Sequence, residues 1–580
     1  MILSAVSLWK KFNTDTPLSA SEWGETVDKT AKMKFQHVAF SGHHVSDGTV
    51  RIYAEFGRPL GDAKCPAILL LPEAGKELDN ELLYYFIEKG YAVLMPDYSG
   101  KMSTDKENCT RTFYPPSLWY ANYETRSGFE FEEKEEDVSD AEKETELDVE
   151  KSCWFEWTYV ALYAIEYLKS RADITNIGVV GIRTGGEVAW KTLLSPDVKC
   201  ALPINAAGWL SSMNTAKFGE NAPVAMSAER HQFIAGIESQ SYAPFVKCPV
   251  LMLCSLHDAN FDCDRAYDTF LRLGGDYENA ILYSPESGSC IGHHALTDMD
   301  IFLEKHLKGR EIYIPDPLNV SLSEENGKII IDIEGDEDGL VKEIGIYYAE
   351  ADVNTKSSYR DWQRICRVGK ANVKNGKFSY KTKAFDGASA VFVYAYAEYF
   401  NGFRIASKIT SKKLPAPNAD AIKSRKLFDG TTVDCFSVAQ YKDYSVAGIF
   451  LENEAVPKLA EGYGGIKGAY SVGGIKTYKI SSPRFVPSEN ALLEFDVYFQ
   501  TTGVLKVAID VADVQLKTER YVCTVDVKGG GKWKRIILQS NDFKSQSIGA
   551  PLANFSEGRA LLFDCEEEGT EYAVTNILWL

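Results

Sequence analysis

Residues 177–190 place an apolar strand, a sharp turn and a helix one after another. The chain there reads Ile177-Gly-Val-Val-Gly-Ile-Arg-Thr-Gly-Gly-Glu-Val-Ala-Trp190, with Arg183 in the middle of the turn. This is the setting of the Gly-x-Ser-x-Gly turn, which holds its central residue at a helix N-terminus as a nucleophile. Glycines are needed there because the helix packs close to the strand, and the N–H groups at the helix start favour negative charge.

The central position of this turn is Arg183 and not serine. A guanidinium stays protonated in proteins and cannot attack an acyl carbon, so the acyl-enzyme route is closed at this position. Two interpretations of Arg183 stay open. Its fork of N–H groups could recognise a carboxylate, sulfate or phosphate, or it could form an internal salt bridge to Asp258 or Glu73 and fill a disused pocket.

The elements around this turn alternate between strand-like and helix-like segments over residues 30–310. Repeated β–α units predict a mostly parallel sheet with helices on both faces. The predicted buried strands are Pro66–Leu71, Tyr91–Met95, Ile177–Gly181, Ala201–Ile204 and Pro249–Leu253. The predicted helices are Leu78–Lys89, Cys153–Ser170, Gly185–Leu194, Cys263–Leu273 and Ala295–Leu307, and Phe35–Phe40 and Thr49–Glu55 predict an antiparallel edge.

With these motifs in this order, residues 30–310 resemble the α/β-hydrolase fold, and within it the dienelactone hydrolase and acetyl-xylan-esterase-like branch. The resemblance implies a catalytic triad in the chain order nucleophile, acid, histidine. The acid position matches Asp258, just past an apolar strand-like run. The histidine position matches His293 or His294, before the last predicted helix.

The same resemblance implies an oxyanion hole beside the turn. The loop at residues 71–76 matches the family's oxyanion-hole loop. A backbone N–H of Glu73 or Ala74 would serve there, together with that of Thr184.

The acid, the histidine pair and the glycines match the family, but the nucleophile is missing. This combination indicates a decayed or repurposed esterase. We expect a pseudoenzyme that binds an anionic or carbohydrate-linked ligand or acts as a scaffold. The alternative is an active carboxylic-ester hydrolase, a carbohydrate deacetylase or small-ester esterase, with an unorthodox nucleophile. Thr184 lies one position too far along and is β-branched, nothing places Cys290 at the turn, and the fold gives Ser99 no such role.

Neither a cofactor nor a metal is expected. His293–His294 is too small a cluster for a metal without a third ligand. None of the twelve cysteines forms a CxxC pair, which argues against zinc ribbons and thioredoxin-type sites. Free, buried thiols without a disulfide spacing pattern fit a reducing compartment.

The charge of the chain bears on its partners. The 580 residues include 63 basic and 82 acidic side chains, a net charge of −19. This disfavours nucleic acid and anionic membrane surfaces as partners, and the expected partner is a small-molecule or carbohydrate ester ligand. No apolar run reaches the roughly 20 residues that span a bilayer.

Location and oligomeric state are less defined by the sequence. Met1–Trp9 is short and is followed by lysines and not by a small-residue cleavage site, so we expect a cytoplasmic protein. A leader removed before residue 1 is compatible with this sequence. The oligomeric state stays open.

The length predicts several domains, because single cores rarely exceed about 250–300 residues. Residues 1–312 form the α/β-hydrolase-like domain, with an acidic insertion at about 102–150. Residues 130–150 carry twelve acidic and two basic side chains, which indicates a solvated insertion or a lid. The aromatic stretch at residues 113–123 could line a pocket or pack the insertion on the domain.

Two β domains are predicted after this one. Residues 313–415 read as an immunoglobulin- or fibronectin-like sandwich, because apolar residues alternate at 391–400 and Asn-Gly pairs separate the strand-like runs. Residues 425–580 resemble a carbohydrate-binding-module-like jelly roll in strand pattern and in the closing segment 572–579. There Trp533, near Gly529–Gly531, could be an aromatic platform or a core residue.

Overall fold

The structure is a computed structural model that describes residues 4–76, 78, 80–100, 111–131, 148–212, 227–258, 260–286, 288–335, 340–351, 366–374, 377–512, 518–565 and 570–580. Most of the predicted acidic insertion, at 101–110 and 132–147, lies outside these residues, as does the Asn375-Gly376 pair.

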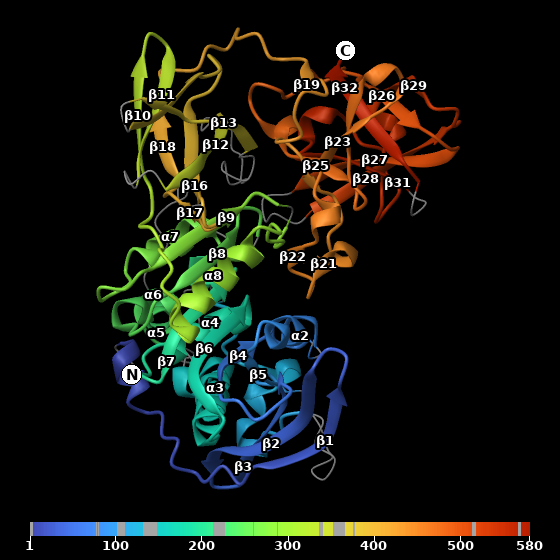
Figure 1. The fold of residues 1–580 in the computed structure, drawn as a ribbon. Coiled ribbons are helices and arrows are strands. Elements are labelled where there is room, and N and C mark those ends of the chain that lie inside the picture. The colour runs from blue at the N-terminus through green and yellow to red at the C-terminus, as the bar shows by residue number, and fades with distance from the viewer. Residues whose placement is uncertain are drawn as a thin grey trace, which may run out of the picture.

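Three bodies follow one another along the chain (Figure 1). The α/β body runs from Ala5 to Lys308, the middle β body from Asn319 to Lys413, and the C-terminal β body from Lys426 to Trp579. An α/β half followed by a β-rich half is therefore confirmed. The domain limits and the immunoglobulin and jelly-roll types stay predictions.

The α/β body is built on one nine-stranded sheet in the order β1-β2-β3-β5-β4-β6-β7-β8-β9. The first four strands in this order pair antiparallel, and the strands from β5 to β9 pair parallel. Their bounds are β1 Ser21–Asp28, β2 Met33–Val45, β3 Gly48–Pro59, β4 Cys65–Leu71, β5 Ala92–Pro96, β6 Ile174–Ile182, β7 Val198–Ile204, β8 Leu251–Ser255 and β9 Ala280–Ser284.

Alternate side chains of these strands enter two different cores. In β4, Ile68 and Leu70 join the core that holds α2 and α8, and Leu69 and Leu71 join the core that holds α3, α4 and α7. Because successive strand residues point to opposite faces, helices cover both faces of the sheet. The helices are α1 Ala5–Trp9, α2 Asn80–Glu88, α3 Cys153–Ser170, α4 Thr184–Thr192, α5 Ala228–Gly236, α6 Ser239–Tyr242, α7 Cys263–Phe270 and α8 Ala295–Lys308.

The aromatic stretch at residues 113–123 packs against the α/β body. Tyr114 and Leu118 are buried. The indole Nε1–H of Trp157, on α3, donates to the Ala121 carbonyl at 2.7 Å. Of the two interpretations of this stretch, the described contacts favour packing.

The middle β body has two antiparallel sheets, β10-β11-β15-β14 and β13-β12-β16-β17, with β18 beside β16. Asn326 and Gly327 both have positive φ, 53° and 72°, between β10 and β11. This confirms the predicted tight hairpin turn. The strands are β10 Asn319–Glu325, β11 Lys328–Glu334, β12 Val341–Ala351, β13 Cys366–Lys370, β14 Asn372–Lys374, β15 Lys377–Lys383, β16 Ala390–Tyr399, β17 Arg404–Ala406 and β18 Thr410–Lys413.

The C-terminal β body has two six-stranded antiparallel sheets around one apolar core. The first contains β19 Lys426–Phe428, β23 Lys458–Glu461, β24 Lys467–Tyr470, β26 Leu493–Phe499, β29 Lys532–Leu538 and β32 Tyr572–Trp579. The second contains β20 Ser437–Val438, β25 Ile475–Thr477, β27 Gly503–Ala512, β28 Thr518–Val527, β30 Lys544–Ser545 and β31 Ala560–Cys565. A separate hairpin of β21 Ser445–Val446 and β22 Phe450–Leu451 extends from this body toward the α/β body (Figure 1).

We expect Gly185→Ala to destabilise the α/β body by about 3 kcal/mol. A Cβ atom there would lie 2.1 Å from the Leu71 carbonyl oxygen and 2.4 Å from that of Pro72, so the helix could not stay in place. Gly309→Ala is the matched control. Gly309 has φ +70° but open space around it, so its cost is the left-handed backbone alone, about 1 kcal/mol. Calorimetric unfolding measures the stability lost by each variant. Equal losses would contradict the close approach of Gly185 to the carbonyls of Leu71 and Pro72.

Candidate functional site

The turn between β6 and α4 is as sharp as the sequence predicts. Arg183 connects the two elements with φ 52° and ψ −112°, a conformation that non-glycine residues rarely adopt. A Cβ atom on Gly181 would lie 2.4 Å from the Gly185 carbonyl oxygen, so strand and helix are in close contact across the turn. Arg183 therefore occupies the apex of a sharp, glycine-lined turn between a strand and a helix.

The Arg183 guanidinium forms ion pairs with two carboxylates. Its Nε donates to Glu73 Oε1 at 2.7 Å, and its Nη1 donates to Asp258 Oδ2. The Asp258 side chain is 2% exposed, and its other oxygen accepts the backbone N–H groups of Asn260 and Phe261 at 2.9 and 3.2 Å. The guanidinium also lies 5.1 Å from the centre of the Phe261 ring. We call Arg183, Glu73 and Asp258 the elbow triad.

The electrostatics of the elbow triad keep Arg183 charged. Burial works against the guanidinium charge, but Asp258 and Glu73 outweigh it and raise the pKa of Arg183. Burial raises the pKa of Asp258 above its usual range although Arg183 acts in the opposite direction. For Glu73 the effect of burial is overcome by Arg183 and Lys76, and its pKa is lowered. One guanidinium therefore faces two acidic groups at this turn.

The two candidate histidines contact the appended bodies. His293 Nδ1 lies 3.1 Å from the Leu451 carbonyl oxygen of β22. His294 directly precedes α8, and burial, with the nearby charge of Arg404, lowers its pKa to about 3, so its ring is neutral. Among the described residues, no hydrogen bond joins either histidine to Asp258.

The loop that matches an oxyanion hole is tied down internally. The Ala74 N–H donates to the Thr184 hydroxyl at 2.6 Å, and the Tyr98 hydroxyl lies 3.2 Å from that same oxygen. The Gly75 N–H donates to Ser99 Oγ at 3.0 Å. The N–H group of Ala74 is thus engaged with the side chain of Thr184.

The three alternative nucleophiles lie in buried surroundings. Thr184 and Ser99 are buried and hydrogen-bonded to the loop just described. Cys290 is fully buried among Leu451 and other apolar residues of the C-terminal β body, and burial raises the pKa of its thiol. None of the three contacts Arg183 through a described hydrogen bond.

Sequence reasoning missed the contribution of the C-terminal β body to this region. The Tyr441 hydroxyl lies 3.1 Å from Ser289 Oγ, beside the candidate histidines. No local pattern marks Tyr441 or Leu451, because both are more than one hundred residues from the histidines that they accompany. Only the tertiary arrangement brings them to the site.

Two further findings concern chemistry and membranes. Within the described ranges, no group of three or more His, Cys, Asp or Glu side chains could hold a metal ion. No helix among the same residues has the length and apolar character needed to cross a membrane.

No family model matches the chain, and no curated protein matches it. Among solved structures, it is similar to an acetyl xylan esterase from Paenibacillus sp. R4, at 18% identity over 52% of this chain and 92% of that one, with a TM-score of 0.37. Acetyl xylan esterase 1 from Thermoanaerobacterium sp. JW/SL YS485 follows at 12% identity, 50% and 91% coverage and a TM-score of 0.34. Est1E from Butyrivibrio proteoclasticus, with ferulic acid bound, shows 14% identity, 45% and 97% coverage and a TM-score of 0.30. At such identities and TM-scores, these likenesses carry no argument about function.

We expect Arg183→Ala to destabilise the α/β body by about 3–5 kcal/mol, because it leaves a buried carboxylate without its cation. Without Arg183, the folded-state pKa of Asp258 rises further above its unfolded value. Below that pKa the Asp258 carboxyl is protonated and neutral, so its burial without a cation costs little stability. As the pH rises through that pKa, the carboxyl becomes a buried, unpaired carboxylate and this stability is lost. The variant should therefore lose less stability at about pH 5 than at about pH 8.

Calorimetric unfolding at the two pH values checks this expectation. Arg310→Ala is the matched control, since the Arg310 side chain is 70% exposed and pairs with Glu304 at 3.4 Å. A shift for Arg183→Ala no larger than that of the control would contradict a structural role for the elbow triad.

Proposed function

We propose that this chain is a non-catalytic protein with an esterase-derived α/β-hydrolase fold, whose former catalytic turn has become an internal structural site. One observation carries the proposal: Arg183, at the nucleophile position, forms ion pairs with both Glu73 and Asp258. The acid that would orient a catalytic histidine is bound to the residue that replaces the nucleophile. Among the functions that the sequence left open, this favours a scaffold.

The same ion pairs argue against an anionic ligand at Arg183. Recognition of a carboxylate or phosphate uses the fork of guanidinium N–H groups. Here Nε and Nη1 already donate to protein carboxylates, and the guanidinium faces two negative charges. An added anion would have to bind beside these two carboxylates, which repel it. We therefore propose that the α/β body holds the two β bodies in place.

A fluorophosphonate probe and short-chain nitrophenyl esters test the absence of catalysis. We expect no labelling and no turnover from the native protein, because a guanidinium is not a nucleophile. Arg183→Ser should stay unlabelled as well, because the described contacts of His293 lead to Leu451 and not to Asp258.

The two variants separate the alternatives. Labelling gained by Arg183→Ser would mean that a histidine still reaches the turn, and that only the nucleophile is missing. Native turnover that disappears in His293→Ala would overturn the proposal and point to an active ester hydrolase.

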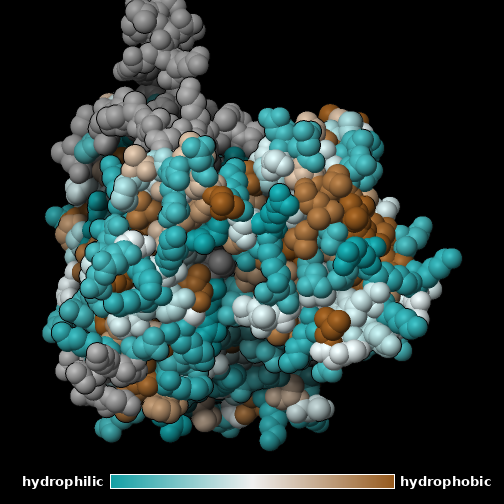
Figure 2. All heavy atoms as spheres, turned by 90° about the horizontal axis from the view of Figure 1, so that it is seen from above, coloured by the Kyte–Doolittle hydropathy of each residue, from teal (hydrophilic) through white to brown (hydrophobic). Residues whose placement is uncertain are grey.

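A second candidate function, carbohydrate binding, is supported by aromatic rings on the C-terminal β body. Tyr498 and Trp533 are cross-strand neighbours on β26 and β29, with ring centres 5.6 Å apart. The Trp533 Nε1–H donates to the carbonyl of Tyr463, a residue that is 59% exposed. Figure 2 shows a hydrophobic area on the side of this body, but tyrosine and tryptophan are not hydrophobic on the scale that colours it, so this area is not formed by these rings. Partly exposed, rigid rings of this kind offer apolar area with polar groups beside it.

Affinity electrophoresis against a panel of soluble polysaccharides tests this second function. Trp533→Ala should abolish any retardation of the native protein, since it removes the ring that contacts both Tyr498 and Gly462. Trp119→Ala, on an exposed tryptophan of the α/β body, is the matched control. No retardation of the native protein on any polysaccharide would leave the scaffold role alone.

A further inference from the structure

We infer that the loop at residues 288–294, which carries both histidines, and the helix α8 that follows it together are a docking receptor for the two β bodies, so that the three bodies form one fixed unit around the elbow triad. This inference deepens the scaffold function proposed above. It is carried by contacts between the bodies that play no part in the chemistry of Arg183. We call residues 288–294 the histidine loop.

The first contact is a backbone bridge to the C-terminal β body. The Ile291 N–H donates to the Ile449 carbonyl at 2.7 Å, and the Leu451 N–H donates to the Ile291 carbonyl at 2.8 Å. Ile291 and Phe450 thus form a parallel β-bridge between two bodies. All of these backbone groups are buried and paired, as a permanent interface requires.

Side chains close around this bridge. Phe450 and Leu451 are fully buried, and Cys290 packs with Leu451. The Glu81 carboxylate at the start of α2 accepts the N–H of Ala447 in the β21–β22 hairpin. The hairpin is therefore held from two separate elements of the α/β body.

A ring-stacking contact also joins the α/β body to the C-terminal β body, at His257. The His257 ring, next to Asp258, stacks on Tyr478 with ring centres 4.0 Å apart and an interplanar angle of 24°. His257 Nδ1 also lies 2.6 Å from the Glu286 carbonyl oxygen, which orients the ring. The contact between the bodies thus extends from the histidine loop to the residue beside the elbow triad.

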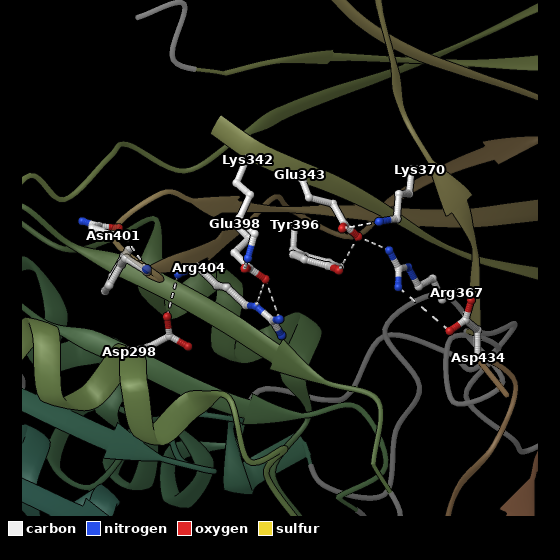
Figure 3. Close-up of polar contacts among 11 residues, drawn as sticks. Asp298, Lys342, Glu343, Arg367, Lys370, Tyr396, Glu398, Asn401, Arg404 and Asp434 are labelled. Atoms are coloured by element: carbon white, nitrogen blue, oxygen red, sulfur yellow. Dashed lines mark hydrogen bonds and ion pairs between the residues drawn. The ribbon is translucent and has the colours of Figure 1, made fainter. Parts of the chain in front are cut away.

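The helix that follows the histidine loop holds the middle β body. Figure 3 shows Asp298, on α8, accepting the backbone N–H of Arg404 at the start of β17. That hydrogen bond is 2.6 Å long, and the Asp298 side chain is fully buried. The Arg404 guanidinium in turn donates to Glu398, which also pairs with Lys342. Arg404 is therefore bound to α8 through its backbone and to Glu398 of the middle β body through its guanidinium.

The middle and C-terminal β bodies also contact each other directly, through ion pairs. The Arg484 guanidinium donates to both oxygens of Glu350, at 2.8 and 2.6 Å, and the Glu350 side chain is 3% exposed. Arg367 also lies 3.9 Å from Asp434 (Figure 3). Because every pair of bodies shares a paired interface, none can rotate without breaking contacts to both of the others.

Hydrogen exchange measured by mass spectrometry on the intact protein tests the docking. We expect the amides of Ile291 and Leu451 to exchange as slowly as those of the inner strands β26 and β27, because they open only when the bodies separate. Phe450→Ala should speed exchange in a peptide covering the histidine loop by about tenfold or more, because it removes the buried ring beside the bridge.

Phe555→Ala is the control variant, because Phe555 is equally buried in the core of the C-terminal β body but away from the hairpin. It should leave exchange in the histidine loop unchanged while exchange inside its own body rises. Fast native exchange at Ile291, or an unchanged loop in Phe450→Ala, would overturn the inference. Should Phe450→Ala fail to fold, the exchange of the native protein still decides. Ester turnover is no part of this readout, so its outcome is separate from that of the labelling experiment.

Discussion

The ion pair between Arg183 and Asp258 is the interaction on which this region depends. Asp258 is almost completely buried, and a buried carboxylate is tolerated only when a cation or several hydrogen bonds accompany it. In a hydrolase-like arrangement this carboxylate would face a histidine. Here a guanidinium at the apex of the turn takes that place, and Glu73 binds its remaining side. The ion pairs of Arg183 thus give this turn a structural role.

The pairing of the acid with Arg183 leaves the histidines to other partners. His293 contacts the backbone of β22, and His294 is neutral beside Arg404 of the middle β body. A general base needs access to a nucleophile and an orienting acid. The loop that would deliver such a base instead lies at the meeting point of three bodies. The proposed absence of catalysis and the docking of the β bodies are thus consistent with each other.

Local sequence patterns predicted the elements that build the turn. Helix α3 has the bounds predicted for it, and the glycines around Arg183 are required by the close approach of α4 to its strand. One of the two interpretations of Arg183, a salt bridge, also followed from residue types alone. The contact between Ile291 and Phe450 could not be foreseen, because strands as short as β22 carry no periodic signal. The strand β9 is not among the predicted strands, although β5 and β8, which have the same length, are.

A double-mutant cycle on Arg183 and Asp258 tests the central claim most directly. The free energy of unfolding of the α/β body would be measured for the native protein, Arg183→Ala, Asp258→Ala and the double variant. If the two side chains stabilise each other as a structural pair, the coupling free energy should be at least about 2 kcal/mol. Single effects that add within about 0.5 kcal/mol would contradict the account. They would mean that Arg183 is held at the turn for another purpose.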